Sequence, residues 1–226
     1  MSIATNLMTI QGRIQDAAAR AGRKPSSVQL VAVSKTVDRD MIEAAHAAGI
    51  RHFGENRVQD LRAKFEQPLG DDVTVHLVGH LQTNKARDAV RYSDIVESVD
   101  RPSLIEALQR RCELKSRDLD VLIQVNVAGE EQKHGCAPED TRMLVELADA
   151  QPNLQVRGLM TIAPLEIESE ATRPVFRALR ELRDQLQAEL PSIDLGELSM
   201  GMTNDFEVAI EEGATMIRLG RAIFEG

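Results

Sequence analysis

The sequence predicts an α/β protein, a single-domain (β/α)8 barrel of the TIM type with an extra N-terminal helix. Eight strand-like segments alternate with helical ones at spacings of about 20 to 45 residues, which calls for a parallel sheet with crossover helices. Residues 48–54 and 212–220 both run from a helix end through a glycine into a short strand and a second glycine. Eight such units use the whole chain of 226 residues, so we expect residues 1–226 to form one domain.

Short apolar runs bounded by turn residues define the strands. The first, Leu30-Val-Ala-Val-Ser-Lys35, is typical of a buried strand because its residues are mostly small or apolar and two are β-branched. In order, the predicted strands cover residues 30–35, 50–53, 73–78, 94–97, 119–127, 154–160, 193–198 and 215–219.

Apolar residues at helical spacing and recognisable ends indicate the helices. Gly22 closes the N-terminal helix, Asp38 can cap the next one, and Pro102 lies in the first turn of a later one. The predicted helices cover residues 2–21, 38–49, 58–65, 85–91, 102–115, 138–150, 168–190 and 205–212. An open doubly wound sheet is the alternative fold, but the G-x-G-x-x-G loop expected after its first strand does not follow Lys35.

The composition narrows the class of protein. A net charge of −9 without a basic run argues against a nucleic-acid binder, and no apolar segment reaches membrane-spanning length. The N-terminus lacks the features of a secretion signal, and Cys112 and Cys136 form no C-x-x-C pair. We therefore expect a cytoplasmic protein with no membrane or nucleic-acid partner, no disulfide framework and no structural zinc site.

Lys35 is the candidate nucleophile at the end of the first strand. Strand alternation places it on the face that carries Val31 and Val33, so its amine is expected at the rim of a dry interior. Poor hydration favours a neutral amine, which is the form that attacks an aldehyde to give a Schiff base. The alternative is a lysine that only ends the strand and reaches into water.

An anion site is predicted after the last two strands, where barrels of this kind often hold phosphate. Residues 199–205 form a small, polar loop whose backbone N–H groups, with the Ser199 and Thr203 hydroxyls, suit a phosphate. Gly220 and Arg221 add a second glycine turn with a cation beside it. Helix capping by the two hydroxyls and an ordinary turn at Gly220 are the alternative explanation.

Arg218 and Asn56 are further candidates. Arg218 lies within the eighth strand and faces either the barrel interior, as a permanent cation, or the space between the outer helices. Asn56 follows the second strand and either offers its amide to a ligand or caps a helix. His76 and His80 are four residues apart but span a strand and a loop, so we predict no metal site from them.

Six ordered segments carry a resemblance to a known family. They are Val31-Ala-Val-Ser-Lys35-Thr, Phe53-Gly-Glu-Asn-Arg-Val-Gln59, His76-Leu-Val-Gly-His-Leu-Gln-Thr-Asn-Lys85, Gly158-Leu-Met-Thr-Ile162, Leu198-Ser-Met-Gly-Met-Thr-Asn-Asp205 and Ile217-Arg-Leu-Gly220. In this order they resemble the pyridoxal phosphate homeostasis proteins, relatives of the alanine racemase barrel. The resemblance extends from about residue 5 to the last residue and implies a single-domain barrel.

The resemblance also implies a cofactor site. Pyridoxal 5′-phosphate (PLP) would be held as a Schiff base on Lys35, with its pyridine nitrogen facing Arg218 and its ring near Asn56. The implied phosphate site comprises Ser199, Gly201, Gly220 and Arg221. Position 221 is more commonly threonine in the family, and the ending Ile223-Phe-Glu-Gly226 departs from the usual Ile-Phe-Gly.

The implied function is a monomeric cytoplasmic protein that holds PLP and passes it on, with PLP-dependent apoenzymes as partners and little turnover. An arginine partner leaves the pyridine nitrogen unprotonated and weakens the electron sink that carbanion chemistry needs. The single tyrosine, Tyr92, is predicted at a helix end, and the domain that supplies the racemase tyrosine is absent. A weak amino-acid racemase or related PLP enzyme is the alternative, followed by a Schiff-base aldolase acting on a sugar phosphate.

Overall fold

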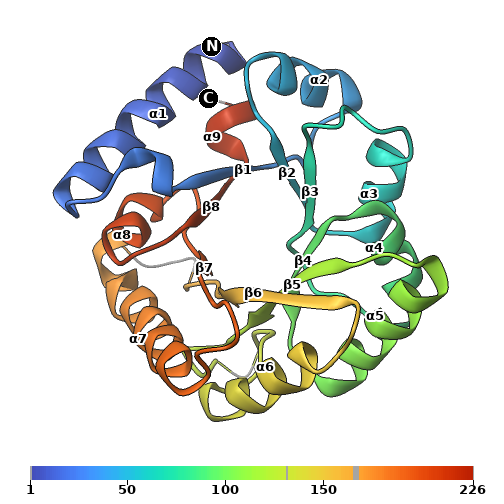
Figure 1. Ribbon diagram of the computed structural model, residues 1–226. Helices are drawn as coiled ribbons and strands as arrows, with labels where there is room; N and C mark the ends of the chain where they lie inside the picture. Colours follow the sequence, from blue (N-terminus) through green and yellow to red (C-terminus); the bar gives the residue numbers. More distant parts are fainter. Residues whose placement is uncertain (1, 131, 165–167, 226) are drawn as a thin grey trace.

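Figure 1 shows the computed structural model, which describes residues 2–130, 132–164 and 168–225. Eight parallel strands form a closed barrel in the order β1 to β8, and β8 pairs with β1 with Val31 opposite Arg218. This confirms the predicted (β/α)8 barrel and rules out the open sheet. The strands are β1 (Gln29–Val33), β2 (His52–Glu55), β3 (Thr74–Leu77), β4 (Ile95–Val99), β5 (Leu119–Gln124), β6 (Leu154–Met160), β7 (Glu197–Ser199) and β8 (Met216–Leu219).

The helices surround the barrel (Figure 1). Asp38 caps one of them as predicted, because its side chain accepts a hydrogen bond from Met41 N at 3.0 Å. The helices are α1 (Ile3–Arg20), α2 (Arg39–Ala47), α3 (Val58–Phe65), α4 (Ala86–Tyr92), α5 (Pro102–Lys115), α6 (Thr141–Asp149), α7 (Arg173–Glu189), α8 (Phe206–Glu211) and α9 (Arg221–Phe224).

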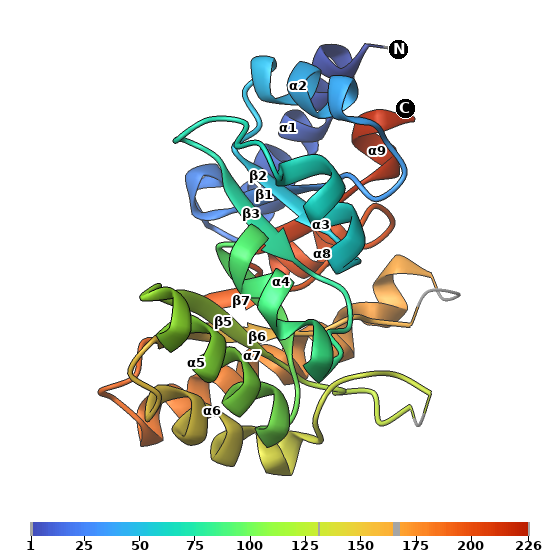
Figure 2. The same ribbon diagram turned by 90° about the vertical axis from the view of Figure 1, so that its right-hand side faces the viewer.

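The extra helix α1 packs beside α8 and α9, where the two ends of the described chain lie close together (Figures 1 and 2). Asn6 is buried and its Nδ2 donates a hydrogen bond to the carbonyl of Ile223 at 3.0 Å. This contact ties the N-terminal helix to α9. The sequence did not predict α9, because four residues are too few to show a helical period.

Several predicted strands differ from the observed ones in length or position, and β2 covers His52–Glu55 rather than residues 50–53. β1 ends at Val33 rather than at residue 35, β5 ends at Gln124 rather than at residue 127, and β7 is only Glu197–Ser199. After Val33 the chain enters the turn closed by Val37 N and the Ser34 carbonyl, and after Gln124 it forms an isolated bridge between Val125 and Cys136. Gly226, the last residue of the ending discussed above, lies outside the described part of the chain.

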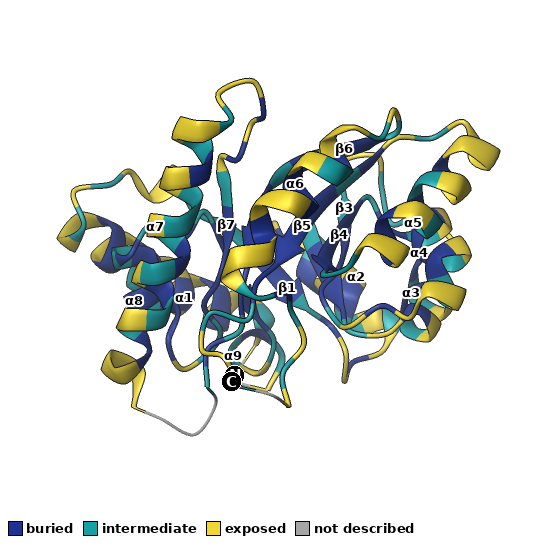
Figure 3. Ribbon diagram, turned by 90° about the horizontal axis from the view of Figure 1, so that it is seen from below, coloured by how far each residue is buried: buried dark blue, intermediate teal, exposed yellow. Residues whose placement is uncertain are grey.

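Most of the apolar core lies between the strands and the helices, where the strands are buried and the outer helix faces are exposed (Figure 3). A smaller apolar cluster of Leu122, Met160 and Met216, with Ile162 packed against it, faces the barrel interior. The rest of the interior includes polar side chains, which lead to the site described below. No helix in the described ranges combines the length and apolar character needed to cross a bilayer.

Candidate functional site

A cavity of about 580 Å³ lies at the carboxyl ends of the strands. Its wall is built from the segments that follow β1, β2, β3, β6, β7 and β8, where sites of (β/α)8 barrels are found. The lining residues that bear on chemistry are Lys35, Asn56, His80, Asp205, Arg218, Gly220 and Arg221.

Lys35 lies in the turn after β1, not in the strand itself. Val37 N donates to the carbonyl of Ser34 at 3.2 Å and closes this turn. Lys35 is exposed, so the expectation of a poorly hydrated amine was wrong. Across residues 2–130, 132–164 and 168–225, its Nζ has no hydrogen bond or ion pair, and it therefore faces the cavity without a competing partner.

A buried polar cluster fixes the backbone that carries Lys35. The Ser34 hydroxyl donates to Glu55 Oε1 at 2.7 Å, and Lys64 Nζ donates to the same oxygen at 2.9 Å. Lys64 Nζ also donates to the carbonyl of Ser34 at 2.6 Å. Burial raises the pKa of Glu55, and the hydrogen bonds from Ser34 and Lys64 oppose that rise. The cluster joins β1, β2 and α3 directly beneath the lysine turn.

Arg218 lies inside the barrel on β8 and is only 5% exposed. Its Nη1 donates to Ser199 Oγ at 2.5 Å, and its Nη2 donates to the carbonyl of Thr161 at 2.8 Å. The carboxylate of Glu97 lies 3.8 Å from Nη1. Burial lowers the pKa of Arg218 and Glu97 opposes this, so the side chain remains a cation held in one position.

Glu97 provides the buried negative charge that compensates Arg218. Ser199 Oγ donates to Glu97 Oε2 at 2.5 Å, and His76 Nδ1 lies 2.7 Å from the other carboxylate oxygen. His52 continues the chain of polar contacts, with its Nδ1 3.1 Å from His76 Nε2. Burial alone would raise the pKa of Glu97, but His76, Arg218 and Ser199 together lower it.

The loop after β7 owes its shape to a glycine and a carboxylate. Gly201 has φ of +93°, and a Cβ atom there would lie 2.5 Å from Ala209 Cβ, so only glycine fits. Its carbonyl accepts a hydrogen bond from Arg218 N at 2.9 Å. Asp205 accepts one from Met202 N at 2.6 Å. The loop is thereby held against β8 at the cavity wall.

The structure brings most of the predicted site residues to one cavity: Lys35, Asn56, Arg218, Gly220 and Arg221. Ser199 and Gly201 are not part of the lining. The Ser199 hydroxyl is fully buried and engaged by Glu97 and Arg218, and Gly201 packs against α8.

Sequence reasoning missed the roles of the ionisable residues behind the wall, namely Glu55, Lys64, His76 and Glu97. A signal was present in the strands. Glu97 stands in the run Ile95-Val-Glu-Ser-Val99, where a charge between apolar neighbours must find a buried partner. The partner itself lies on β8, more than a hundred residues away, and no local pattern identifies it.

Comparisons with known proteins find similarity along nearly the whole chain. The profile of the family described as "Alanine racemase, N-terminal domain" matches residues 5–226. A pyridoxal phosphate homeostasis protein of Aquifex aeolicus is 44% identical over 224 residues, which cover 99% of this chain and 98% of that protein. The human protein of the same name is 37% identical, and the match covers 99% of this chain and 86% of that protein.

Two solved structures illustrate the similarity in three dimensions. PipY of Synechococcus elongatus with PLP bound is 40% identical, with a TM-score of 0.85 and coverage of 99% of this chain and 100% of that chain. Alanine racemase from Corynebacterium glutamicum is 17% identical, with a TM-score of 0.71 and coverage of 96% and 60%, and shares the fold alone. The chain therefore belongs to the family of the pyridoxal phosphate homeostasis proteins, built on the barrel of the alanine racemase N-terminal domain.

Proposed function

We propose that this chain binds PLP as a Schiff base on Lys35 and acts in intracellular PLP homeostasis without robust catalysis. The observation that carries the proposal is that an unengaged, exposed amine shares one cavity with two arginines, Arg218 and Arg221. The names of the relatives and the PLP bound to PipY support the same function.

The residues fit the three functional parts of PLP. Lys35 offers the amine for the aldehyde: a carbon–nitrogen bond forms and the carbonyl oxygen leaves as water. Arg218 offers a fixed cation for the pyridine nitrogen. Gly220 and Arg221, with residues 202–205 on the same wall, offer a polar site for the phosphate. A cavity of about 580 Å³ lies in the size range of small-molecule sites.

The other predicted site residues receive definite roles in this proposal. Asn56 lines the cavity and lies near the ring. Ser199 acts behind the wall, where its hydroxyl holds Arg218 Nη1 and links it to Glu97. Gly201 acts through its backbone, whose carbonyl fixes the peptide of Arg218. Ser199 and Gly201 thus position the site without touching the ligand.

The same residues favour holding PLP over turning over a substrate. Bound PLP supplies an electron sink whose strength depends on a proton at the pyridine nitrogen. Arg218 does not give up its proton, so it leaves that nitrogen unprotonated. Tyr92 is the last residue of α4 and packs against the core, and it does not line the cavity in the part of the chain that the structure describes.

The exposure of Lys35 suits a reversible carrier. PLP bound to Lys35 would be accessible at its aldehyde carbon to an amine from solvent or to the active-site lysine of a PLP-dependent apoenzyme. We therefore propose that such apoenzymes are the partners and that the chain acts as a monomer, with residues 1–226 as one PLP-binding domain. Cys112 and Cys136 are buried free thiols, which supports a reducing cytoplasm as its location.

An absorbance spectrum tests the proposal. Purified protein incubated with PLP should be yellow, and the visible imine band should be absent in Lys35→Ala. Lys115→Ala is the matched control, because this exposed lysine on α5 lies outside the cavity, and it should keep the band. A colourless wild type after loading, or a Lys35→Ala variant with an undiminished band, would refute the assignment.

One observation favours the alternative of a weak amino-acid racemase. A racemase needs a second acid/base besides the lysine, and His80 lines the same cavity. Holoprotein incubated with L-alanine in D2O would then exchange the Cα hydrogen, and His80→Gln would abolish this exchange. Wild-type protein that shows no exchange above free PLP leaves only the carrier function.

A further inference from the structure

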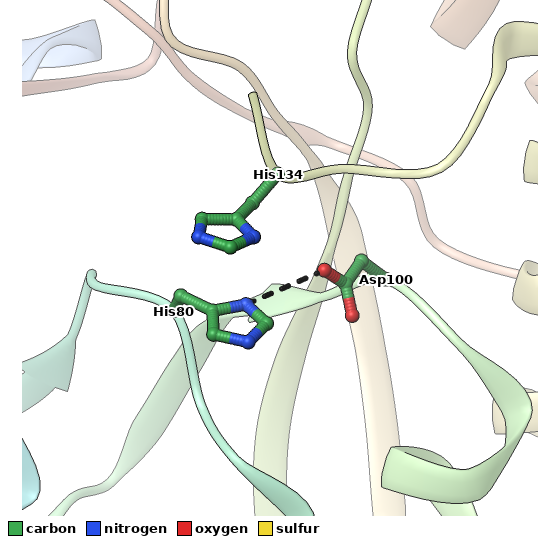
Figure 4. A group of neighbouring side chains, drawn as sticks. All are labelled: His80, Asp100 and His134. Atoms are coloured by element: carbon green, nitrogen blue, oxygen red, sulfur yellow. Dashed lines mark ion pairs between the residues drawn. The ribbon is translucent and has the colours of Figure 1, made fainter. Parts of the chain in front are cut away.

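A cluster of metal-ligating side chains lies beside the cavity, on the loops that follow three consecutive strands. His80 follows β3, Asp100 follows β4, and His134 lies in the loop after β5 (Figure 4). One donor atom from each lies within 4.8 Å of the others, and His80 Nδ1 is 3.6 Å from Asp100 Oδ2. We propose that these three residues form a binding site for a divalent transition-metal ion, Zn²⁺ by its donor set.

The spacing of the donors suits a metal ion. Three atoms no more than 4.8 Å apart share a point that lies within about 2.8 Å of each, so contractions of less than about 1 Å bring all three to zinc-ligand distances of 2.0–2.2 Å. Two imidazole nitrogens and one carboxylate oxygen make a ligand set that zinc sites use with one position left open. The open position takes water or an oxygen ligand.

The surrounding contacts hold two of the ligands from behind. Asp100 Oδ1 accepts a hydrogen bond from Arg101 Nη1 at 2.5 Å, which leaves Oδ2 directed at His80. The backbone of His134 is tethered, because Gln124 Nε2 donates to its carbonyl at 3.1 Å. Partners of this kind, which orient the ligands, are a regular feature of metal sites.

The two imidazole rings are the part that must move. They are stacked, with centroids 3.7 Å apart and planes 12° from parallel, so their nitrogens do not yet converge on one point. Both histidines are exposed, so the proposal requires the exposed His134 ring to rotate about its side-chain bonds when the metal binds.

The site is distinct from the PLP assignment, although His80 also lines the cavity. The inference does not depend on PLP binding, because the ligands can be tested in protein from which PLP has been removed. A bound cation at this position would place a positive charge at the cavity wall, opposite in sign to the PLP phosphate.

Calorimetric titration of the untagged, full-length protein with ZnCl2, before and after PLP loading, tests the site. We expect one Zn²⁺ per chain, and at least about a tenfold weaker affinity in His134→Ala and in Asp100→Asn. MgCl2, which prefers oxygen ligands, should give no such binding. His46→Ala is the matched control: His46, in the last turn of α2, pairs at 3.1 Å with Asp72, which precedes β3, and its loss should leave zinc binding unchanged.

Two outcomes would overturn the proposal. One is wild-type protein that binds no stoichiometric zinc. The other is binding that His134→Ala and Asp100→Asn leave intact while circular dichroism shows both variants folded. Because these residues lie on exposed or half-exposed loop positions, the two variants are expected to fold.

Discussion

Lys35 and Arg218 line the same cavity, yet their surroundings differ in almost every respect. Lys35 lies in a turn, is exposed, and has no polar partner among the described residues. Arg218 lies within a strand, is 5% exposed, and is held by Ser199, the Thr161 carbonyl and Glu97. The cavity thus has one basic side chain that is exposed and unpartnered among the described residues, and one that is buried and fixed.

This difference shows how the site can hold a ligand and still release it. A lysine without partners can form and break a covalent bond with an aldehyde, because no native contact opposes the reaction. An arginine locked by a buried carboxylate keeps a fixed position and a fixed charge. In the proposed function, Lys35 therefore supplies the reactive amine and Arg218 supplies a fixed cation for the pyridine ring.

The largest expected effect is a complete loss of covalent PLP binding without a loss of stability. Lys35→Ala should remove the covalent PLP adduct completely, while the free energy of unfolding of the PLP-free protein changes by no more than about 0.5 kcal/mol, since the exposed side chain makes no polar contact. Urea titration of PLP-free wild type and variant measures the second quantity. A loss of 2 kcal/mol or more, of the order of a core mutation, would show that Lys35 is a structural residue.

Behind Arg218, by contrast, we expect a substitution to lower the stability of the fold. Glu97→Gln removes the buried charge that compensates the guanidinium and should lower the free energy of unfolding by about 3–5 kcal/mol. Glu106→Gln on the exposed face of α5 is the control, with an expected change near zero. A Glu97→Gln protein as stable as the control would mean that Arg218 does not depend on this carboxylate.

Acid should lower the free energy of unfolding through protonation of His52 in the same barrel interior. Burial, together with His76, lowers the pKa of His52 from 6.5 to about 4, so the folded protein binds fewer protons than the unfolded chain between these values. Stability contributed by neutral His52 is present above pH 6.5 and is lost as the pH falls toward 4, by about 1–2 kcal/mol after allowance for solvent screening.

Denaturant titrations at pH 7 and pH 4.5 measure this loss. Glu97, whose pKa is lowered, loses its contribution in the same direction at lower pH, so a second protein is needed to isolate the histidine. In His52→Gln the stability difference between the two pH values should be smaller than in wild type. An equal difference in both proteins would assign the acid sensitivity to other groups.

An effect of similar size concerns the support of the lysine turn. Ser34→Ala removes the hydrogen bond to Glu55 Oε1 and leaves that buried oxygen with Lys64 alone. We expect a loss of about 1–2 kcal/mol and slower adduct formation, because the turn is less well fixed. Stopped-flow absorbance after mixing with PLP measures the rate. An unchanged rate would show that the position of Lys35 does not depend on this cluster.

The fold was predictable because its signals are local. The α5 helix begins at Pro102 and ends at Lys115, and β6 covers Leu154–Met160, both as predicted from an apolar period and its flanking residues. β1 was predicted two residues too long, because the Ser34 side chain and carbonyl bond to Glu55 and Lys64, which no nearby residue signals.

The site was predictable where it follows from strand ends and not where it depends on contacts across the barrel. Lys35, Asn56 and Gly220 follow their strands directly and reach the cavity. Ser199 also ends a strand, but its hydroxyl turns inward to Glu97 on β4. The sequence gives no distance between these two residues, so it could not indicate that this hydroxyl is engaged behind the cavity wall.

The most direct test of the account is the location of the covalent bond. Wild-type protein loaded with PLP should be reduced with borohydride, digested, and its peptides mapped by mass spectrometry. We expect a single stoichiometric phosphopyridoxyl group on Lys35 and none on Lys64, which is engaged by Glu55 and Ser34. Modification spread over surface lysines, or located mainly on Lys64 or Lys85, would contradict it.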